Sequence, residues 1–223
     1  SNCELFRDEV AFLGHIVGRE GVRTDPKKTE TIRKWPQPEN VHDIRSFLGL
    51  CAYYRRFVPK FAERSKNLYT LTRKNAKFEW GKEQEDAFRD LKNCLVTTPI
   101  LSYPKDEGRY VLDTDASDTS LGGVLSQEQE GKEVVICYLS RNLTKEEKRY
   151  CVTRKELLAV VYGAKQCKHY LLGRRFLLRT DHGSLTCLMN FREMDRGTTQ
   201  KCGCLKPKAV FSMWKTRLET GED

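Results

Sequence analysis

The stretch YVLDTDASDTSLGGVLSQ, residues 110–127, decides the fold of this chain. Its first residues alternate in the period-2 pattern of a half-buried strand, which ends near Asp115. A turn rich in Asp, Ser and Thr follows, and Gly122 and Gly123 then open a second apolar run that returns beside the first strand. An acid at a strand end, followed by small residues and glycines, suits a backbone that approaches a ligand closely. Taken alone, a hairpin that ends in a solvated Asp is the simpler interpretation.

The composition describes a chain of 223 residues, which is long enough for one large or two small domains. Lys and Arg number 40 against 31 Asp and Glu, and the formal net charge of +9 favours a polyanionic partner. Nine scattered cysteines predict reduced thiols in an intracellular protein, and their spacing argues against zinc. No apolar run reaches the roughly 18 residues that span a bilayer, so no membrane partner is expected. The first residue is Ser1 rather than Met, which suggests a fragment.

The first hundred residues are expected to be mainly helical, after a short strand or hairpin between residues 5 and 23. Asp25 and Asn40 are predicted to cap two helices at their N-termini. Residues 59–74 predict one further helix, and another begins near Lys82. On that last helix, two acids are expected to be solvated: Asp86 and Asp90.

Aromatic and basic residues alternate where the second helix ends, in YYRRF at residues 53–57. Such a cluster could hold a phosphate backbone or stack on bases. The nucleic-acid contacts predicted here are Tyr53, Tyr54, Arg55 and Arg56. A helix end with solvated arginines and core aromatics explains the pattern equally well.

The second half continues with strand-like and helix-like segments. Residues 133–141 predict a third strand, and residues 174–181 a fourth that again ends in Thr-Asp. Two capping boxes are expected between them, Thr144 with Glu147 and Thr153 with Glu156. The second box would start a long helix whose apolar stripe comprises Leu157, Val161, Ala164 and Leu171. Between residues 145 and 179 there are ten Lys or Arg and three Glu, a basic surplus that suits a nucleic-acid backbone.

Three acids occupy comparable places in this half of the chain. Asp115 closes the first strand, Glu156 opens the long helix and Asp181 closes the fourth strand. Converging carboxylates repel one another unless a hard cation neutralises them, and paired Mg²⁺ ions can activate water for phosphodiester cleavage. Each acid also has a plain structural explanation: a turn residue, a capping-box partner and a helix cap. The three together favour a metal site.

The sequence resembles the pol polyprotein of gypsy-class LTR retrotransposons, from the end of the reverse transcriptase into its ribonuclease H domain. The resemblance covers roughly residues 3–193, and the stretches that carry it are FLGHIVGREGV, DPKKTETIRKWPQPENVHDIRSFLGLCAYYRRFVPKF, FEWGKEQEDAFRDLKNCL, TDASDTSLGGVLSQ, KELLAVVYGAKQCKHYL and RTDHGSL. It implies an α/β fold with a ribonuclease H-like mixed sheet, preceded by a mainly helical thumb/connection-like segment. The expected parts are residues 1–100 for that segment, 101–193 for the ribonuclease H-like domain and 194–223 for a divergent tail.

The resemblance also implies a function. Asp115, Glu156 and Asp181 match three of the four acids that hold Mg²⁺ or Mn²⁺ and catalyse hydrolysis of the RNA strand in RNA–DNA hybrids. The expected partner is an RNA–DNA hybrid or a template–primer duplex, together with the rest of the reverse transcriptase. Further contacts to it are predicted along and after the long helix: Lys155, Lys165, Lys168, His182 and Ser184.

Two departures from the family bear on that function. The Tyr-x-Asp-Asp turn of the polymerase site is missing, so this chain is not expected to polymerise. Residues 194–223 lack the family's last helix, its His-Arg-Pro-Gly turn and its final strand and helix with the fourth acid; a frameshifted copy is one hypothesis, which genomic DNA would test. The candidate replacements for that acid are Asp195, Glu219, Glu222 and Asp223. The alternatives to an active ribonuclease H are a catalytically dead nucleic-acid-binding remnant and a nonfunctional translated relic.

Overall fold

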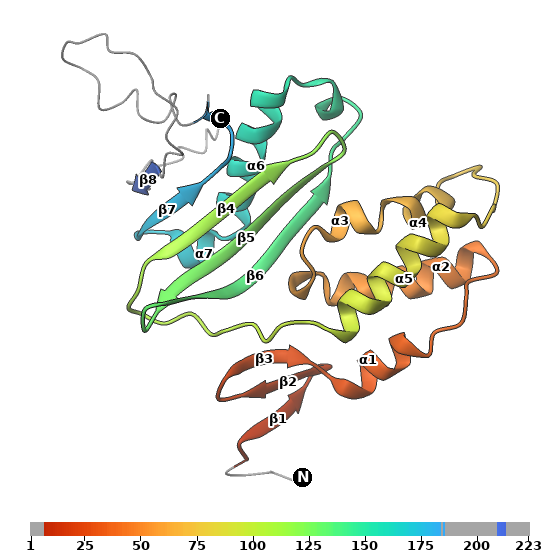
Figure 1. Ribbon diagram of the computed structural model, residues 1–223, viewed down its shortest axis with the longest axis horizontal. Helices are drawn as coiled ribbons and strands as arrows, with labels where there is room; N and C mark the ends of the chain where they lie inside the picture. The colour runs from red at the N-terminus through yellow and green to blue at the C-terminus, as the bar shows by residue number, and fades with distance from the viewer. Residues whose placement is uncertain (1–6, 184, 186–208, 213–223) are drawn as a thin grey trace, which may run out of the picture.

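The computed structural model describes residues 7–183, residue 185 and residues 209–212. A five-stranded sheet lies beside a group of helices, and a three-stranded sheet lies next to both (Figure 1). One cluster of buried apolar side chains fills the helical part and another lies between the large sheet and the helices that cover it. The fold is therefore mixed α/β with a mixed sheet, as predicted from the sequence.

The small sheet is an antiparallel meander at the start of the chain. Its first turn joins the paired residues Phe12 and His15 through Leu13 and Gly14, both with positive φ, which suits a tight hairpin. The predicted hairpin is confirmed and continues into a third strand. The strands are β1 (Glu9–Phe12), β2 (His15–Gly18) and β3 (Gly21–Thr24).

The helical part begins with the two capped helices that the sequence predicts. The Asp25 side chain accepts a hydrogen bond from the Lys27 amide at 2.9 Å, and the Asn40 side chain accepts one from the Asp43 amide at 3.0 Å. The helices are α1 (Pro26–Arg33), α2 (Val41–Tyr53), α3 (Phe61–Arg64), α4 (Lys66–Leu71) and α5 (Lys82–Val96), with a short 3₁₀ helix η1 (Arg55–Phe57) after α2.

The single helix predicted over residues 59–74 is wrong, because the structure divides it into α3 and α4 at Ser65. The buried Ser65 hydroxyl donates to the Phe61 carbonyl at 2.7 Å, a local side-chain bond that competes with a regular helix. Phe61, Leu68 and Leu71 are nevertheless buried, as their spacing predicts.

The large sheet has the strand order β6-β5-β4-β7-β8. The chain runs antiparallel through the first three strands, crosses over through α6 and α7, and returns with β7 parallel to β4. Although the tail matches no family motif, four of its residues form β8, antiparallel to β7. The elements are β4 (Tyr110–Ala116), β5 (Ser120–Gln129), β6 (Lys132–Asn142), the 3₁₀ helix η2 (Glu147–Arg149), α6 (Val152–Gln166), α7 (Lys168–Leu171), β7 (Arg175–Arg179) and β8 (Ala209–Ser212).

Helix α6 packs against β4 and β5. Of the predicted apolar stripe, Leu171 is buried, although in α7, and Ala164 is half-buried, but the other two residues lie at the surface. Leu157 and Val161 are 41% and 40% exposed, whereas Glu156, Ala159 and Gly163 are buried. A Cβ atom at Gly163 would lie 3.3 Å from Leu112, so the missing side chain lets the helix approach the sheet closely on that face. Because this face of α6 lies against the sheet, Glu156 points toward the end of β4.

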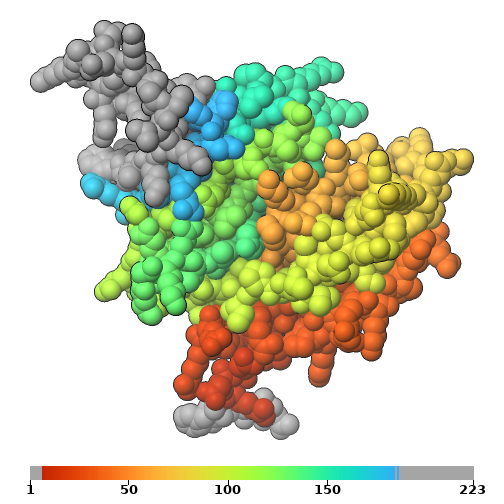
Figure 2. Space-filling model, in the orientation of Figure 1, coloured from red at the N-terminus to blue at the C-terminus, as the bar shows by residue number. Residues whose placement is uncertain are grey.

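The helical part and the large sheet are in direct contact (Figure 2). The Ala62 amide, in α3, donates to the Ser140 hydroxyl of β6 at 3.0 Å. Val135 and Tyr138 of β6 also pack against the buried cluster of the helical part. This contact places the chain just before α3 beside the end of β4. Among the described residues, no helix has the length and apolar character that crossing a bilayer requires.

Candidate active site

Asp115 and Asp181 lie together because their strands are parallel neighbours. Asp113 of β4 pairs with Arg179, the last residue of β7, and each acid follows two residues later in the chain. Their side chains therefore emerge at the same edge of the sheet. Asp115 is half-buried and Asp181 is exposed.

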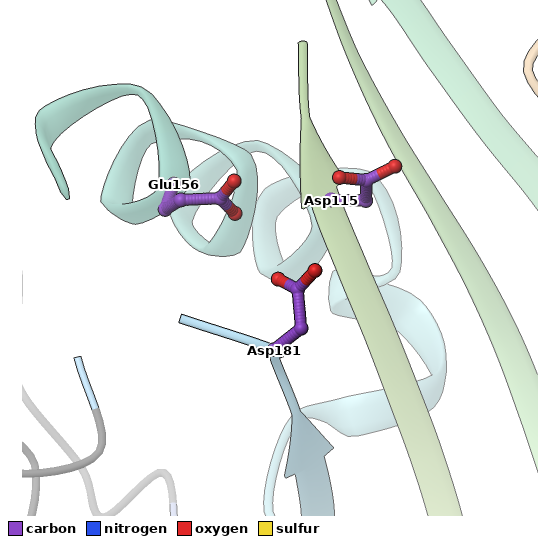
Figure 3. A group of neighbouring side chains, drawn as sticks. All are labelled: Asp115, Glu156 and Asp181. Atoms are coloured by element: carbon purple, nitrogen blue, oxygen red, sulfur yellow. The ribbon is translucent and has the colours of Figure 1, made fainter. Parts of the chain in front are cut away.

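Glu156 reaches the same edge from α6 (Figure 3). Carboxylate oxygens of Asp115, Glu156 and Asp181 all lie within 4.8 Å of one another. The Glu156 side chain is only 4% exposed. One of its oxygens, Oε1, accepts a hydrogen bond from the Ala116 amide at 3.2 Å, while the buried Oε2 has no hydrogen-bond partner among the described residues.

This environment disfavours the charged form of Glu156. The pKa of Glu156 is raised from an ordinary value of 4.5 to about 7. Burial is the largest cause, and the carboxylates of Asp181 and Asp115 contribute to the rise. The hydrogen bond from the Ala116 amide acts in the opposite direction. A cation at this place would relieve both the repulsion and the loss of hydration.

The donor set suits a hard divalent cation. All three side chains offer carboxylate oxygens, the ligands that Mg²⁺ prefers, and an unpaired buried oxygen is a costly feature to keep without a ligand. Asp115 also has a neighbour of opposite charge, because Lys60 Nζ lies 2.8 Å from Asp115 Oδ2. Lys60 could not be recognised from the sequence, because nothing in the pattern around it distinguishes it from other lysines.

The capping box predicted for Thr153 and Glu156 is wrong. Cys151 occupies the N-cap of α6, and the Thr153 hydroxyl lies 2.9 Å from His182 Nε2 instead. This explanation for Glu156 as a structural cap is therefore excluded, whereas the box of Thr144 with Glu147 is present. The Thr153 contact holds the imidazole of His182 at the rim of the acidic cluster.

Three predicted nucleic-acid contacts on α6 and α7 differ in their surroundings. Lys155 is only 6% exposed, and its ammonium lies 2.8 Å from Asp118 Oδ1. Lys165 and Lys168 are exposed, but Lys165 follows Glu156 by nine residues, about 14 Å along a helix. The structure therefore does not bring these two lysines to the acids. Ser184 lies outside the described residues.

The YYRRF cluster is partly a structural feature. Tyr54 is 1% exposed and its hydroxyl donates to the Gly14 carbonyl at 2.6 Å, so the prediction that it contacts nucleic acid is wrong for this conformation. Tyr53 is 50% exposed, although its hydroxyl donates to the Leu13 carbonyl. Arg55 and Arg56 are exposed and stay candidates for phosphate contacts.

The sequence and fold comparisons define the class of the protein. Residues 80–178 match the family described as "RNase H-like domain found in reverse transcriptase". One similar solved structure is the foamy viral protease-reverse transcriptase in complex with double-stranded DNA. Its sequence is 25% identical to this chain, the match covers 75% of this chain and 30% of that chain, and the TM-score is 0.64. A second, in complex with an RNA/DNA hybrid, is 24% identical, covers 87% of this chain and 27% of that chain, and has a TM-score of 0.69. The chain therefore carries a ribonuclease H-like domain of the reverse-transcriptase kind.

Two Drosophila melanogaster proteins place the chain in its family. It is 39% identical over 217 residues to the retrovirus-related Pol polyprotein from transposon 297, which covers 97% of this chain and 19% of that protein. It is 37% identical over 188 residues to the Pol polyprotein from transposon 412, which covers 84% of this chain and 15% of that protein. The chain is therefore a relative of the retrotransposon Pol polyproteins and spans less than a fifth of the length of these two proteins.

Proposed function

We propose that this chain is the ribonuclease H part of a retrotransposon reverse transcriptase and hydrolyses the RNA strand of RNA–DNA hybrids. The observation that carries the proposal is the buried, unpaired Oε2 of Glu156, on a carboxylate that lies within 4.8 Å of two further carboxylates. A folded protein rarely keeps such an oxygen without a ligand to satisfy it.

Asp115, Glu156 and Asp181 would hold Mg²⁺ or Mn²⁺ through one or more carboxylate oxygens each. Bound there, the metal would supply an activated water and charge neutralisation at the scissile phosphate. The Ala116 amide fixes the orientation of the Glu156 carboxylate through its hydrogen bond. The Thr153 contact fixes the His182 ring at the rim, where the proposal assigns it a contact to the nucleic acid.

The proposed partner is an RNA–DNA hybrid, by analogy with the foamy viral enzyme that was solved with such a hybrid. The net charge of +9 favours a polyanion of this kind. Contacts to its backbone are assigned to Arg55, Arg56, Lys165 and Lys168, with Tyr53 as a stacking surface. The candidates for a fourth acid, in residues 195–223, lie outside the described residues.

Cleavage of a labelled RNA–DNA hybrid in Mg²⁺ and in Mn²⁺ tests the proposal, with Glu156→Gln beside the wild type. We expect metal-dependent cleavage that falls at least about 100-fold in the variant, since the substitution removes a charged ligand from the metal site. Glu130→Gln is the matched control, because it makes the same substitution in an exposed turn, where Glu130 pairs with Lys105.

The same samples separate an enzyme from a binding remnant. Hybrid binding is measured in parallel by fluorescence anisotropy at two salt concentrations. Salt-sensitive binding without any cleavage by the wild type would contradict the hydrolase and identify a nucleic-acid-binding remnant. The absence of both binding and cleavage would favour a nonfunctional relic.

A further inference from the structure

Lys60 connects the helical part of the chain to the acidic cluster. Its ammonium lies 2.8 Å from Asp115 Oδ2, across more than fifty residues of sequence. Both side chains are about half exposed, at 57% and 48%, so the pair is open to water. Such a pair is weak and exchangeable, unlike a buried ion pair.

The backbone conformation of Lys60 directs its side chain toward the acidic cluster. Lys60 has φ 53° and ψ 35°, a left-handed conformation that is uncommon for a residue other than Gly, and it immediately precedes α3. Its carbonyl accepts hydrogen bonds from the Glu63 and Arg64 amides at 3.0 and 3.2 Å. Because the Ala62 amide is bonded to Ser140 on β6, this turn is fixed against the sheet rather than free at the surface.

The sheet leaves room for the stem of Lys60. Gly122 of β5 is the register partner of Asp115, and a Cβ atom at Gly122 would lie 4.0 Å from Lys60 Cγ. Lys60, Asp115 and Gly122 line one small pocket, together with Glu63, Ser117, Ser120 and Leu121. The ammonium therefore reaches Asp115 over a strand surface that carries no side chain at this point.

We propose that Lys60 is a tethered counter-cation that competes with the divalent metal for the Asp115 carboxylate. In the absence of metal, its ammonium offsets part of the repulsion among the three acids. When the metal binds Asp115, the Lys60 ammonium moves away from Oδ2, which its exposed position permits. This inference rests on the proposed metal site and adds that the helical part of the chain sets how tightly the site takes its metal.

Other charges around Lys60 support this arrangement. Its pKa is raised first by the hydrogen bond and charge of Asp115, and further by Glu63 and Asp181. The Lys60 ammonium therefore interacts with two of the three acids in the cluster. A divalent cation at the cluster would repel this ammonium, so the two cations disfavour each other there.

Direct binding of Mn²⁺, followed by the loss of the free-ion signal in electron paramagnetic resonance, tests the competition without a substrate. We expect Lys60→Met to lower the dissociation constant about threefold to fivefold, as removal of an exposed opposing charge would do. Lys60→Arg keeps the charge and should bind as the wild type does. Lys66→Met removes the same charge from an exposed position at the start of α4 and should also leave the affinity unchanged.

The possible results distinguish the inference from the proposed function. Equal Mn²⁺ affinity in the wild type and Lys60→Met would overturn the inference and leave the metal site intact. No Mn²⁺ binding by the wild type, or binding that Glu156→Gln does not weaken, would overturn the proposed metal site and the inference with it. A difference between wild type and Lys60→Met that shrinks as salt is added would support the electrostatic competition.

Discussion

Carboxylates in the helical part and at the edge of the large sheet differ in whether their oxygens have hydrogen-bond partners. In the helical part, both oxygens of Asp90 on α5 accept hydrogen bonds from Arg64 on α3, at 2.6 and 2.7 Å. At the sheet edge, Glu156 is more deeply buried than Asp90 and yet has an oxygen without a partner. A paired charge is compatible with a purely structural role, whereas an unpaired one has a cost that a proton or a ligand must offset. This difference separates residues kept for stability from residues kept for chemistry.

The largest expected effect comes from removing the unpaired charge. The pKa of Glu156 rises from 4.5 to about 7 in the folded protein, so the folded state binds more protons than the unfolded state between these values. The metal-free protein should therefore lose stability as the pH rises from about 4.5 to 7, and should change little from this group above that range. Glu156→Gln should remove that loss and raise the free energy of unfolding at pH 8 by about 1–2 kcal/mol.

Thermal unfolding in a chelator between pH 5 and 8 measures this effect, with Glu130→Gln as the control. The variant would be more stable than the wild type while losing cleavage, which is the pattern of a site kept for function at the expense of stability. If Glu156→Gln were less stable than the wild type at pH 8, the Glu156 carboxylate would have a structural partner and the contrast with Asp90 would fail.

The convergence of the acids could be predicted because it follows from strand order. Two strand ends on parallel neighbours must emerge at one edge of a sheet, and the sequence marks both ends with Thr-Asp. The metal-binding role of these acids stays a prediction. The face of α6 could not be predicted from apolar spacing, because a glycine, Gly163, decides how closely the helix approaches.

Contacts between distant segments explain the other differences between sequence and structure. Thr153 follows the sequence pattern of a capping box. Its hydroxyl instead contacts His182, which lies after β7 in the sequence. Lys60 reaches Asp115 through a turn whose direction depends on the packing of α3 against β6. Local patterns carry no information about such partners.

A smaller effect is expected from a hydroxyl in the helical part. Tyr54→Phe would remove the buried hydroxyl's hydrogen bond to the Gly14 carbonyl, which keeps its bond from the Asp25 amide at 3.2 Å, and should cost about 1 kcal/mol of stability. Tyr53→Phe is the control, since this side chain is half exposed and water can replace its bond to Leu13. Chemical denaturation of both variants measures the difference. Equal losses would mean that burial of Tyr54 does not decide its contribution.

The smallest expected effect comes from the paired acid itself. Although the sequence predicted solvation for Asp86 and Asp90 of α5, Asp90 is paired with Arg64 and only partly exposed. Asp90→Asn weakens this pair and should cost about 0.5 kcal/mol, the usual range for partly exposed ion pairs. Asp86→Asn, on the same helix and exposed, is the control and should cost less.

Hybrid cleavage by Asp90→Asn then decides the comparison. The substitution lies outside the acidic cluster, so the folded fraction of the variant should cleave at the wild-type rate. A loss of cleavage comparable to that of Glu156→Gln would show that the Arg64 pair also supports the chemistry. In that case α3, which contains Arg64 and directly follows the turn at Lys60, would control the site as a whole. Paired and unpaired carboxylates could then no longer be assigned to separate roles.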